Sequence, residues 1–200
     1  MVKQERAVRT RRALIEAAAE VFAEEGYVLA SLTTISGRAG VSNGALHFHF
    51  KNKQALARAV EEEAALAVAR IVEGTGAVGG GVLQELVDTS YVLMDRLAQD
   101  PVVRAGFELG GEGREGAGSC QQGWRRWVEE AVVRAEREGG LAEGVSSDAA
   151  ACTIVAATVG FEVLGAQDPA WYAEHRIAGF WELLLPGLRG AEQKEDHTVR

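Results

Sequence analysis

Residues 31–50 have the sequence SLTTISGRAGVSNGALHFHF. Ser31 can cap a short helix, because a serine hydroxyl accepts a hydrogen bond from a backbone N–H of the first turn. Gly40 can end that helix, since glycine adopts the left-handed conformation without a steric penalty. Ser42 can then cap a second helix over residues 43–48. Two short helices joined by a glycine turn form a helix-turn-helix, and this motif decides the fold of the N-terminal part.

The second helix of the motif starts with the small polar residues Ser42, Asn43 and Gly44. In a helix-turn-helix this helix lies in the DNA major groove, with its N-terminal residues against the base edges. A helix N-terminus with a hydroxyl also favours a phosphate. Asn43 is the best candidate for reading a base, because its amide can form two hydrogen bonds with adenine. Ile35 and Val41 are placed to hold the two helices together.

Helical patterns flank the motif on both sides. Apolar residues recur at the spacing of one helical face before it (Leu14, Ala18, Val21, Phe22) and after it (Leu56, Val60, Ala64, Ala67, Ile71). The first set predicts a helix from Arg6 to Glu25, which Gly26 can terminate, and the second set predicts a longer helix after Asn52.

Charge is unevenly distributed along the chain. The net charge is −8, yet residues 1–58 carry nine Lys and Arg against five Glu, which makes this segment +4 and the remainder −12. A basic head on an acidic body can present one face to a polyanion while the rest is repelled by it.

A second, larger part follows the basic head. Residues 74–81 (GTGAVGGG) are glycine-rich and predict a flexible joint, and no period-2 strand pattern of useful length is present. The predicted later helices are Val82–Gln99, one starting at Pro101, Trp124–Glu138, Asp148–Leu164 and Ala170–Leu188. We therefore predict an all-α chain, with a helix-turn-helix domain over residues 1–58, a helical bundle domain over 59–190 and a polar tail over 191–200.

The last two predicted helices are apolar on more than one face. Such helices need a partner to cover them, which favours a four-helix interface between two copies of the chain. A dimer also suits DNA recognition, since one recognition helix contacts only a few base pairs.

Residues 39–53, AGVSNGALHFHFKNK, closely resemble the DNA-binding signature of the tetracycline-repressor (TetR) family, AGVSxGxLYxHFxxK. The resemblance implies that residues 42–49 form the recognition helix and that Lys53 lies beside the DNA backbone. His47 replaces the usual tyrosine, and an imidazole can still donate a hydrogen bond to a phosphate. The predicted DNA-contacting residues are Arg9, Arg12, Ser31, Thr33, Ser42, Asn43, Gly44, His47, His49 and Lys53.

Two later stretches, PVVRAGFEL (101–109) and VGFEVLG (159–165), resemble the γ-butyrolactone receptor branch of that family. Members of this branch are autoregulator receptors that control antibiotic production. By its spacing to Gly139, Trp124 rather than Trp127 matches the tryptophan that lines the ligand pocket in the branch. Glu108 stands where many members have arginine, and residues 110–118 are unusually rich in glycine. The predicted ligand-contacting residues are Trp124, Phe107, Trp127, Thr158 and Tyr91.

These features predict a homodimeric cytoplasmic repressor that binds pseudo-palindromic double-stranded operator DNA. A small apolar signal, γ-butyrolactone-like or a related furan or butenolide, would release it and so control antibiotic biosynthesis genes. One alternative is a pseudo-receptor that responds to an antibiotic or its precursor. Two others are a small-molecule enzyme with an incidental helical head and an adaptor that is monomeric alone.

We expect no catalysis, cofactor, metal site or membrane segment. Two GxGxxG strings, at residues 74–79 and 111–116, follow no buried strand, which argues against a dinucleotide site. His47 and His49 are two residues apart and do not share a helix face, so they form a poor metal pair. Cys120 and Cys152 are predicted to be free thiols. We also expect no secretory signal, because the basic start of the sequence lacks the apolar stretch that such a signal needs.

Overall fold

The computed structural model describes residues 2–75, 80–111 and 119–189, and these residues are helical apart from turns and one isolated bridge between Leu141 and Arg189. The predicted all-α class is confirmed. The chain forms two compact units, the first from Met1–Ala67 with Gln99–Gln121 and the second from Val68–Ala98 with Gln122–Arg200. The glycine strings at 74–79 and 111–116 lie largely outside the described residues, as does the tail at 191–200.

The first unit contains the helix-turn-helix. Its helices are α1 (Val2–Leu29), α2 (Leu32–Arg38), α3 (Asn43–His49), the first part of α4 (Lys53–Gly74) and α6 (Pro101–Gly111). Helix α1 begins at Val2, earlier than predicted, and its regular part ends at Gly26, where φ is 74°. The predicted glycine terminus is therefore confirmed, and a short continuation carries the chain to Leu29.

Helix α6 belongs to the first unit, although it follows α5 in the chain, because it packs along α1. Gly106 makes a close approach possible, since a Cβ at this position would collide with Ala64 of α4 and approach the sulfur of Cys120. The glycine-rich segment at 74–81 therefore does not separate two consecutive blocks of sequence. Along the sequence, residues 68–98 belong to the second unit, residues 99–121 belong to the first, and the residues from 122 onward belong to the second again.

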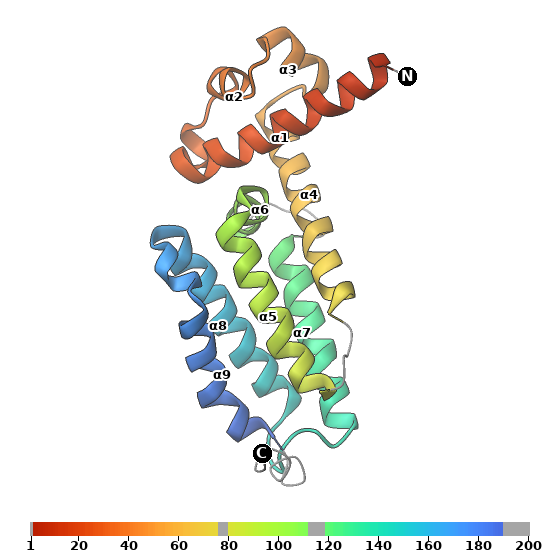
Figure 1. Ribbon diagram of the computed structural model, residues 1–200, viewed down its shortest axis with the longest axis vertical. Coiled ribbons are helices and arrows are strands. Elements are labelled where there is room, and N and C mark those ends of the chain that lie inside the picture. The colour runs from red at the N-terminus through yellow and green to blue at the C-terminus, as the bar shows by residue number, and fades with distance from the viewer. Residues whose placement is uncertain (1, 76–79, 112–118, 190–200) are drawn as a thin grey trace, which may run out of the picture. The chain divides into compact units, whose positions relative to one another are not determined.

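The second unit is a bundle of α5 (Gly81–Gln99), α7 (Cys120–Arg137), α8 (Ser147–Gln167) and α9 (Glu174–Leu188), to which the end of α4 is attached (Figure 1). Side-chain contacts join each of these four helices to two others of the bundle. The contacts are Arg134–Glu85 between α7 and α5, Trp124–Thr158 between α7 and α8, Phe161–Phe180 between α8 and α9, and Trp181–Ser90 between α9 and α5.

The predicted single helix from Ala170 to Leu188 is wrong in its first turn. Residues Pro169–Tyr172 form a 3₁₀ turn, η1, and Ala173 is extended before α9 begins. The Asp168 side chain accepts a hydrogen bond from the Ala170 N–H and so starts the turn separately. The buried ring of Tyr172 packs against Gly165 of α8, where a Cβ would collide with it. Tertiary packing therefore overrides the helical pattern at this point.

Helix α8 is long and apolar enough to cross a membrane by length and composition alone, a test that the core helix of a soluble protein also passes. Only 33 % of its apolar window is buried within the chain. Val163 and Leu164 of this helix are among the exposed large apolar side chains, together with Leu183 of α9. The chain thus leaves apolar surface of its last helices uncovered.

Candidate nucleic-acid interface and ligand site

The two caps predicted for the helix-turn-helix are both formed. Ser31 Oγ accepts a hydrogen bond of 3.0 Å from Thr34 N at the start of α2, and Ser42 Oγ accepts one of 3.2 Å from Ala45 N at the start of α3. Gly40 has a φ of 66° in the turn. Ile35 and Leu46 are fully buried between the helices and fix their packing. This arrangement leaves the N-terminal end of α3 in solvent.

That end of α3 presents Ser42, Asn43 and Gly44, which are all exposed. The Asn43 amide also contacts Ser36, whose Oγ lies 2.6 Å from Asn43 Oδ1. Farther along the helix His47 is exposed, and His49 is half-buried edge-on against the Phe48 ring. Phe48 itself is 81 % exposed, an aromatic side chain at the C-terminal end of α3 that sequence reasoning did not single out.

Basic side chains lie around the motif in different environments. Arg9 is exposed, while Arg12 is paired with Glu16 along the helix at 2.8 Å. The predicted contacts Ser31 and Thr33 are exposed at the start of α2. Arg38, at the end of α2, donates a hydrogen bond of 2.6 Å to Glu24 of α1, and this bond lowers the pKa of the Glu24 carboxyl. Arg38 therefore ties α2 to α1.

Lys53 has a structural role that the family signature does not indicate. Its Nζ donates three hydrogen bonds to backbone carbonyls at the end of α1, to Tyr27 O (2.7 Å), Val28 O (3.0 Å) and Ala30 O (2.8 Å). It also lies 4.7 Å from the centre of the Tyr27 ring. An ammonium group has three N–H donors, so all of them are used within the protein. Lys53 thus joins the start of α4 to the end of α1.

A buried polar pair lies between α7 and α8 of the second unit. Trp124 is 1 % exposed, and its Nε1–H donates a hydrogen bond of 2.8 Å to Thr158 Oγ1. The hydroxyl of Thr158 lies in turn 2.9 Å from the Ile154 carbonyl oxygen of its own helix. The Trp127 ring is tilted against Trp124, with 5.1 Å between ring centres. The structure therefore brings three of the predicted ligand-contacting residues together between α7 and α8.

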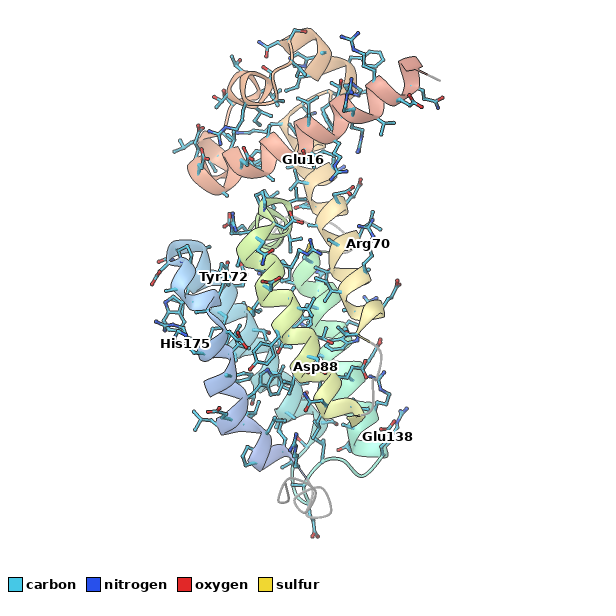
Figure 2. All side chains as sticks on the ribbon, viewed as in Figure 1. Glu16, Arg70, Asp88, Glu138, Tyr172 and His175 are labelled. Atoms are coloured by element: carbon cyan, nitrogen blue, oxygen red, sulfur yellow. The ribbon has the colours of Figure 1, made fainter. Side chains whose placement is uncertain are left out.

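The other two predicted ligand residues lie elsewhere. Phe107 is buried on α6 in the first unit. Tyr91 lines a cleft of about 570 Å³ together with Tyr172 and three acidic side chains, Asp88, Asp95 and Glu174. Figure 2 labels Asp88 and Tyr172, on α5 and at the end of η1. Burial raises the pKa of the Tyr91 phenol above 10.0, and the carboxylates of Glu174 and Glu182 raise it further.

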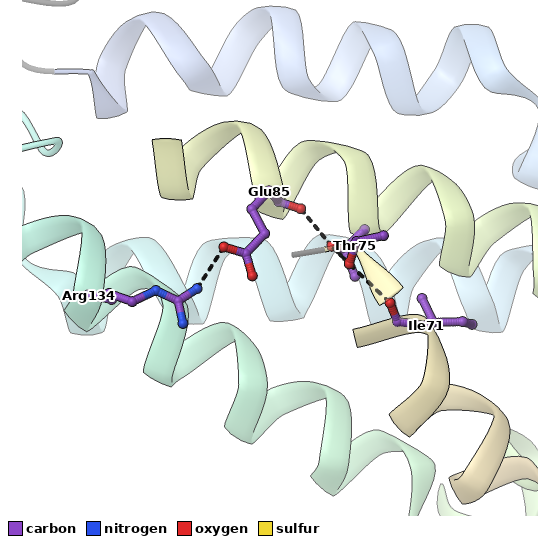
Figure 3. A network of polar contacts seen from close by, with 5 residues as sticks. Ile71, Thr75, Glu85 and Arg134 are labelled. Carbon is purple, nitrogen blue, oxygen red and sulfur yellow. Dashed lines mark hydrogen bonds and ion pairs between the residues drawn. The ribbon is translucent and has the colours of Figure 1, made fainter. Parts of the chain in front are cut away.

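A polar network anchors the end of α4 within the second unit (Figure 3). Thr75 Oγ1 lies 3.0 Å from the Ile71 carbonyl oxygen and 2.6 Å from Thr89 Oγ1 of α5, so one of the two hydroxyls donates to the other. Thr89 is fully buried, and its Oγ1 lies 2.7 Å from the Glu85 carbonyl oxygen. The Glu85 carboxylate accepts a hydrogen bond of 2.8 Å from Arg134 of α7. No sequence motif pointed to this network, because its members are ordinary residue types at helical spacing.

Comparison with known proteins matches both parts of the chain to one family. Residues 14–60 match the family of bacterial regulatory proteins named after the tetracycline repressor, and residues 81–190 match the C-terminal domain described as tetracycline-repressor-like. The A-factor receptor protein of Streptomyces griseus is 33 % identical over 193 residues, which are 94 % of this chain and 67 % of that protein.

Solved structures with the same fold are also known. The crystal structure of a gamma-butyrolactone receptor, described as ArpA-like, is 29 % identical with a TM-score of 0.82, over 95 % of this chain and 93 % of the other. The structure of CprB from Streptomyces coelicolor in complex with its biological operator sequence is 30 % identical with a TM-score of 0.80, over 94 % and 92 % of the two chains.

Proposed function

Because this chain belongs to the TetR family of bacterial regulatory proteins, and is a DNA-binding repressor regulated by a small ligand, we propose that its signal is a γ-butyrolactone or a related furan or butenolide. We further propose that it controls antibiotic biosynthesis genes, acts in the cytoplasm and carries out no catalysis itself. The buried Trp124–Thr158 pair is the observation that carries the choice of ligand.

DNA binding is supported by the geometry of the first unit. The N-terminal end of α3 is exposed and rigidly placed by the two serine caps, which is the arrangement that lets a recognition helix enter the major groove. The segment is also the basic part of an acidic chain, and positive charge supplies the part of DNA affinity that does not depend on sequence. Arg9 and His47 are exposed and are proposed phosphate contacts.

Ligand binding is supported by the chemistry of the pair between α7 and α8. A lactone ring offers only hydrogen-bond acceptors, so its site must provide donors in an otherwise apolar lining. The indole N–H of Trp124 and the hydroxyl of Thr158 are such donors, and the aromatic ring of Trp127 adds apolar surface beside them. In the structure the indole N–H donates to the Thr158 hydroxyl oxygen, and the hydroxyl donates to the Ile154 carbonyl oxygen, so both donors have partners until a ligand takes their place.

Dimerisation is supported by the uncovered apolar surface of α8 and α9. Two copies that pack these helices together would form a four-helix interface and would hold two recognition helices at a fixed separation. We propose that the ligand favours a dimer whose recognition helices are wrongly spaced for the operator. Helix α4 supplies a covalent link for this change, since it begins in the first unit and ends in the polar network of the second.

One experiment tests the function as a whole. Purified protein is used to select bound fragments from genomic DNA, and release from the selected fragment is then titrated with an alkyl-substituted γ-butyrolactone. We expect release by the lactone, whereas a fragment released only by an antibiotic or its precursor would identify a pseudo-receptor.

The variants Trp124→Phe and Thr158→Val, which keep most of the buried volume, test the site itself. Each should bind the operator as wild type does but need about tenfold more lactone for release, because one donor is lost. Release of both variants at the wild-type lactone concentration would move the ligand site away from this pair.

A further inference from the structure

The buried serine of α2, Ser36, contacts both the turn and the first residue of the recognition helix. It is 4 % exposed. Its backbone oxygen accepts a hydrogen bond of 3.0 Å from Val41 N in the turn. Its hydroxyl lies 2.6 Å from Oδ1 of Asn43 and 3.0 Å from the Thr33 carbonyl oxygen. A single side chain thus connects the core of the motif to the exposed amide of Asn43.

The contact lengths of this cluster decide how the amide is oriented. A serine hydroxyl carries one proton, so it donates fully to only one of its two neighbours. The 2.6 Å contact with Asn43 Oδ1 has the length of an O–H···O hydrogen bond and is shorter than an N–H···O bond usually is, while the contact with the Thr33 carbonyl oxygen is longer, at 3.0 Å. Ser36 therefore donates to Asn43 Oδ1 and holds the amide with its oxygen toward the serine.

This orientation determines what Asn43 offers to DNA. One lone pair of Oδ1 accepts from Ser36, while the second lone pair of Oδ1 and the N–H groups of Nδ2 remain for DNA at the exposed end of α3. An adjacent acceptor and donor match the N6 amino group and the N7 acceptor of adenine in the major groove.

From this geometry we infer that Ser36 is a positioning residue, which holds the Asn43 amide so that it selects adenine at one position of each operator half-site. The inference rests on the proposed function, because it requires α3 to enter the major groove.

The test begins with the operator that the full-length wild-type protein selects from a randomised pool of DNA duplexes. Each adenine of the half-site is replaced in turn by 7-deazaadenine, which lacks the N7 acceptor, and by purine, which lacks the 6-amino group. Wild type should lose about tenfold in affinity with each analogue at one position. Ser36→Ala should bind the unmodified operator about tenfold more weakly and should no longer distinguish the analogues there.

Two further variants separate positioning from packing. Asn43→Ala should lose the same discrimination, and adding Ser36→Ala to it should weaken binding no further, because the serine acts through the asparagine. Thr34→Ala is the matched control, since it removes a hydroxyl from the same helix that does not reach Asn43. It should keep the wild-type preference for adenine.

The outcomes distinguish this inference from the proposed function. A wild-type protein that selects no sequence contradicts both. A selected operator on which Ser36→Ala keeps the full response to both analogues overturns the inference alone. The same holds if Ser36→Ala weakens binding equally on the operator, on its analogues and on unrelated duplexes, because the serine would then only support packing.

Discussion

The ammonium group of Lys53 stabilises the end of a helix to which it is not adjacent in the chain. The last carbonyls of a helix lack intrahelical donors, and a cation there also opposes the negative end of the helix dipole. Lys53 supplies three donors to this region, at Tyr27, Val28 and Ala30. A residue that the family signature places beside DNA is therefore also part of the framework that holds the first unit together.

Replacing Lys53 by methionine should test this framework role. The change keeps the length of the side chain but removes its charge and all three donors. We expect the free energy of unfolding to fall by about 1–3 kcal/mol, because hydrogen bonds from a charged donor are lost from a half-buried site. Urea denaturation of the full chain measures the change.

Lys51→Met is the matched control, since Lys51 is exposed two residues earlier. Its unfolding free energy should stay within about 0.5 kcal/mol of wild type. If both variants unfold at the wild-type urea concentration, the three hydrogen bonds contribute nothing and the role of Lys53 is confined to DNA.

At the scale of elements, α4, α5 and α7 are joined by side chains that differ in their exposure. Arg134 is partly exposed, so its ion pair with Glu85 stabilises little on its own. The pair of hydroxyls formed by Thr75 and Thr89 is shielded by the full burial of Thr89. The ion pair joins α7 to α5, whereas the threonine pair joins the end of α4 to α5 and is the connection that holds α4 to the bundle.

The variant Thr89→Val should weaken that connection with almost no change in volume. We expect a loss of about 1 kcal/mol in the free energy of unfolding, since one buried hydroxyl partner is removed. Operator binding without ligand should be retained, but more lactone should be needed for release, because α4 is held less firmly to the unit that contains the ligand site. A release titration on the selected operator measures this shift.

Thr153→Val provides the comparison for this variant. The Thr153 hydroxyl lies 2.8 Å from the Ala149 carbonyl oxygen of its own helix, as the Thr89 hydroxyl lies beside that of Glu85, and its side chain is exposed. It should leave the release curve unchanged. Identical release curves for Thr89→Val and wild type would show that the hydroxyl pair does not couple α4 to the ligand site.

At the scale of the whole molecule, the apolar surface of α8 and α9 requires a partner. Leu183 is 86 % exposed and Val163 47 % exposed, which is unfavourable for large apolar side chains in water. If a second copy covers them, placing a charge at either position leaves that charge buried and unpaired. Such a charge costs about 3–5 kcal/mol in an interface.

Leu183→Glu and Val163→Glu should therefore raise the dimer dissociation constant by a factor of about 100 or more. Loss of operator binding should accompany loss of the dimer, because one recognition helix contacts too few base pairs. Analytical ultracentrifugation gives the oligomeric state of each variant.

Val92→Glu serves as the control, since Val92 is 41 % exposed on α5 of the same unit and outside the two late helices. It should remain a dimer. Dimers of unchanged stability for both α8 and α9 variants would place the interface on another surface.

The sequence by itself determined the local features of this protein. The serine caps of α2 and α3, the glycine positions at Gly26 and Gly40 and the all-α class could be predicted, because caps, turns and helical periodicity depend on residues within a few positions of one another. The family could be predicted for the same reason, since its signature is a continuous stretch of fifteen residues, 39–53.

Only the tertiary structure decided which distant residues meet. It placed α6 with α1, divided the predicted last helix at Ala173, and brought Trp124 to Thr158 while leaving Tyr91 apart from them, in a cleft with Tyr172. It also gave Lys53 and Ser36 their partners. Such pairs depend on how helices pack side by side, and a helical pattern shows which face is buried but not which helix covers it.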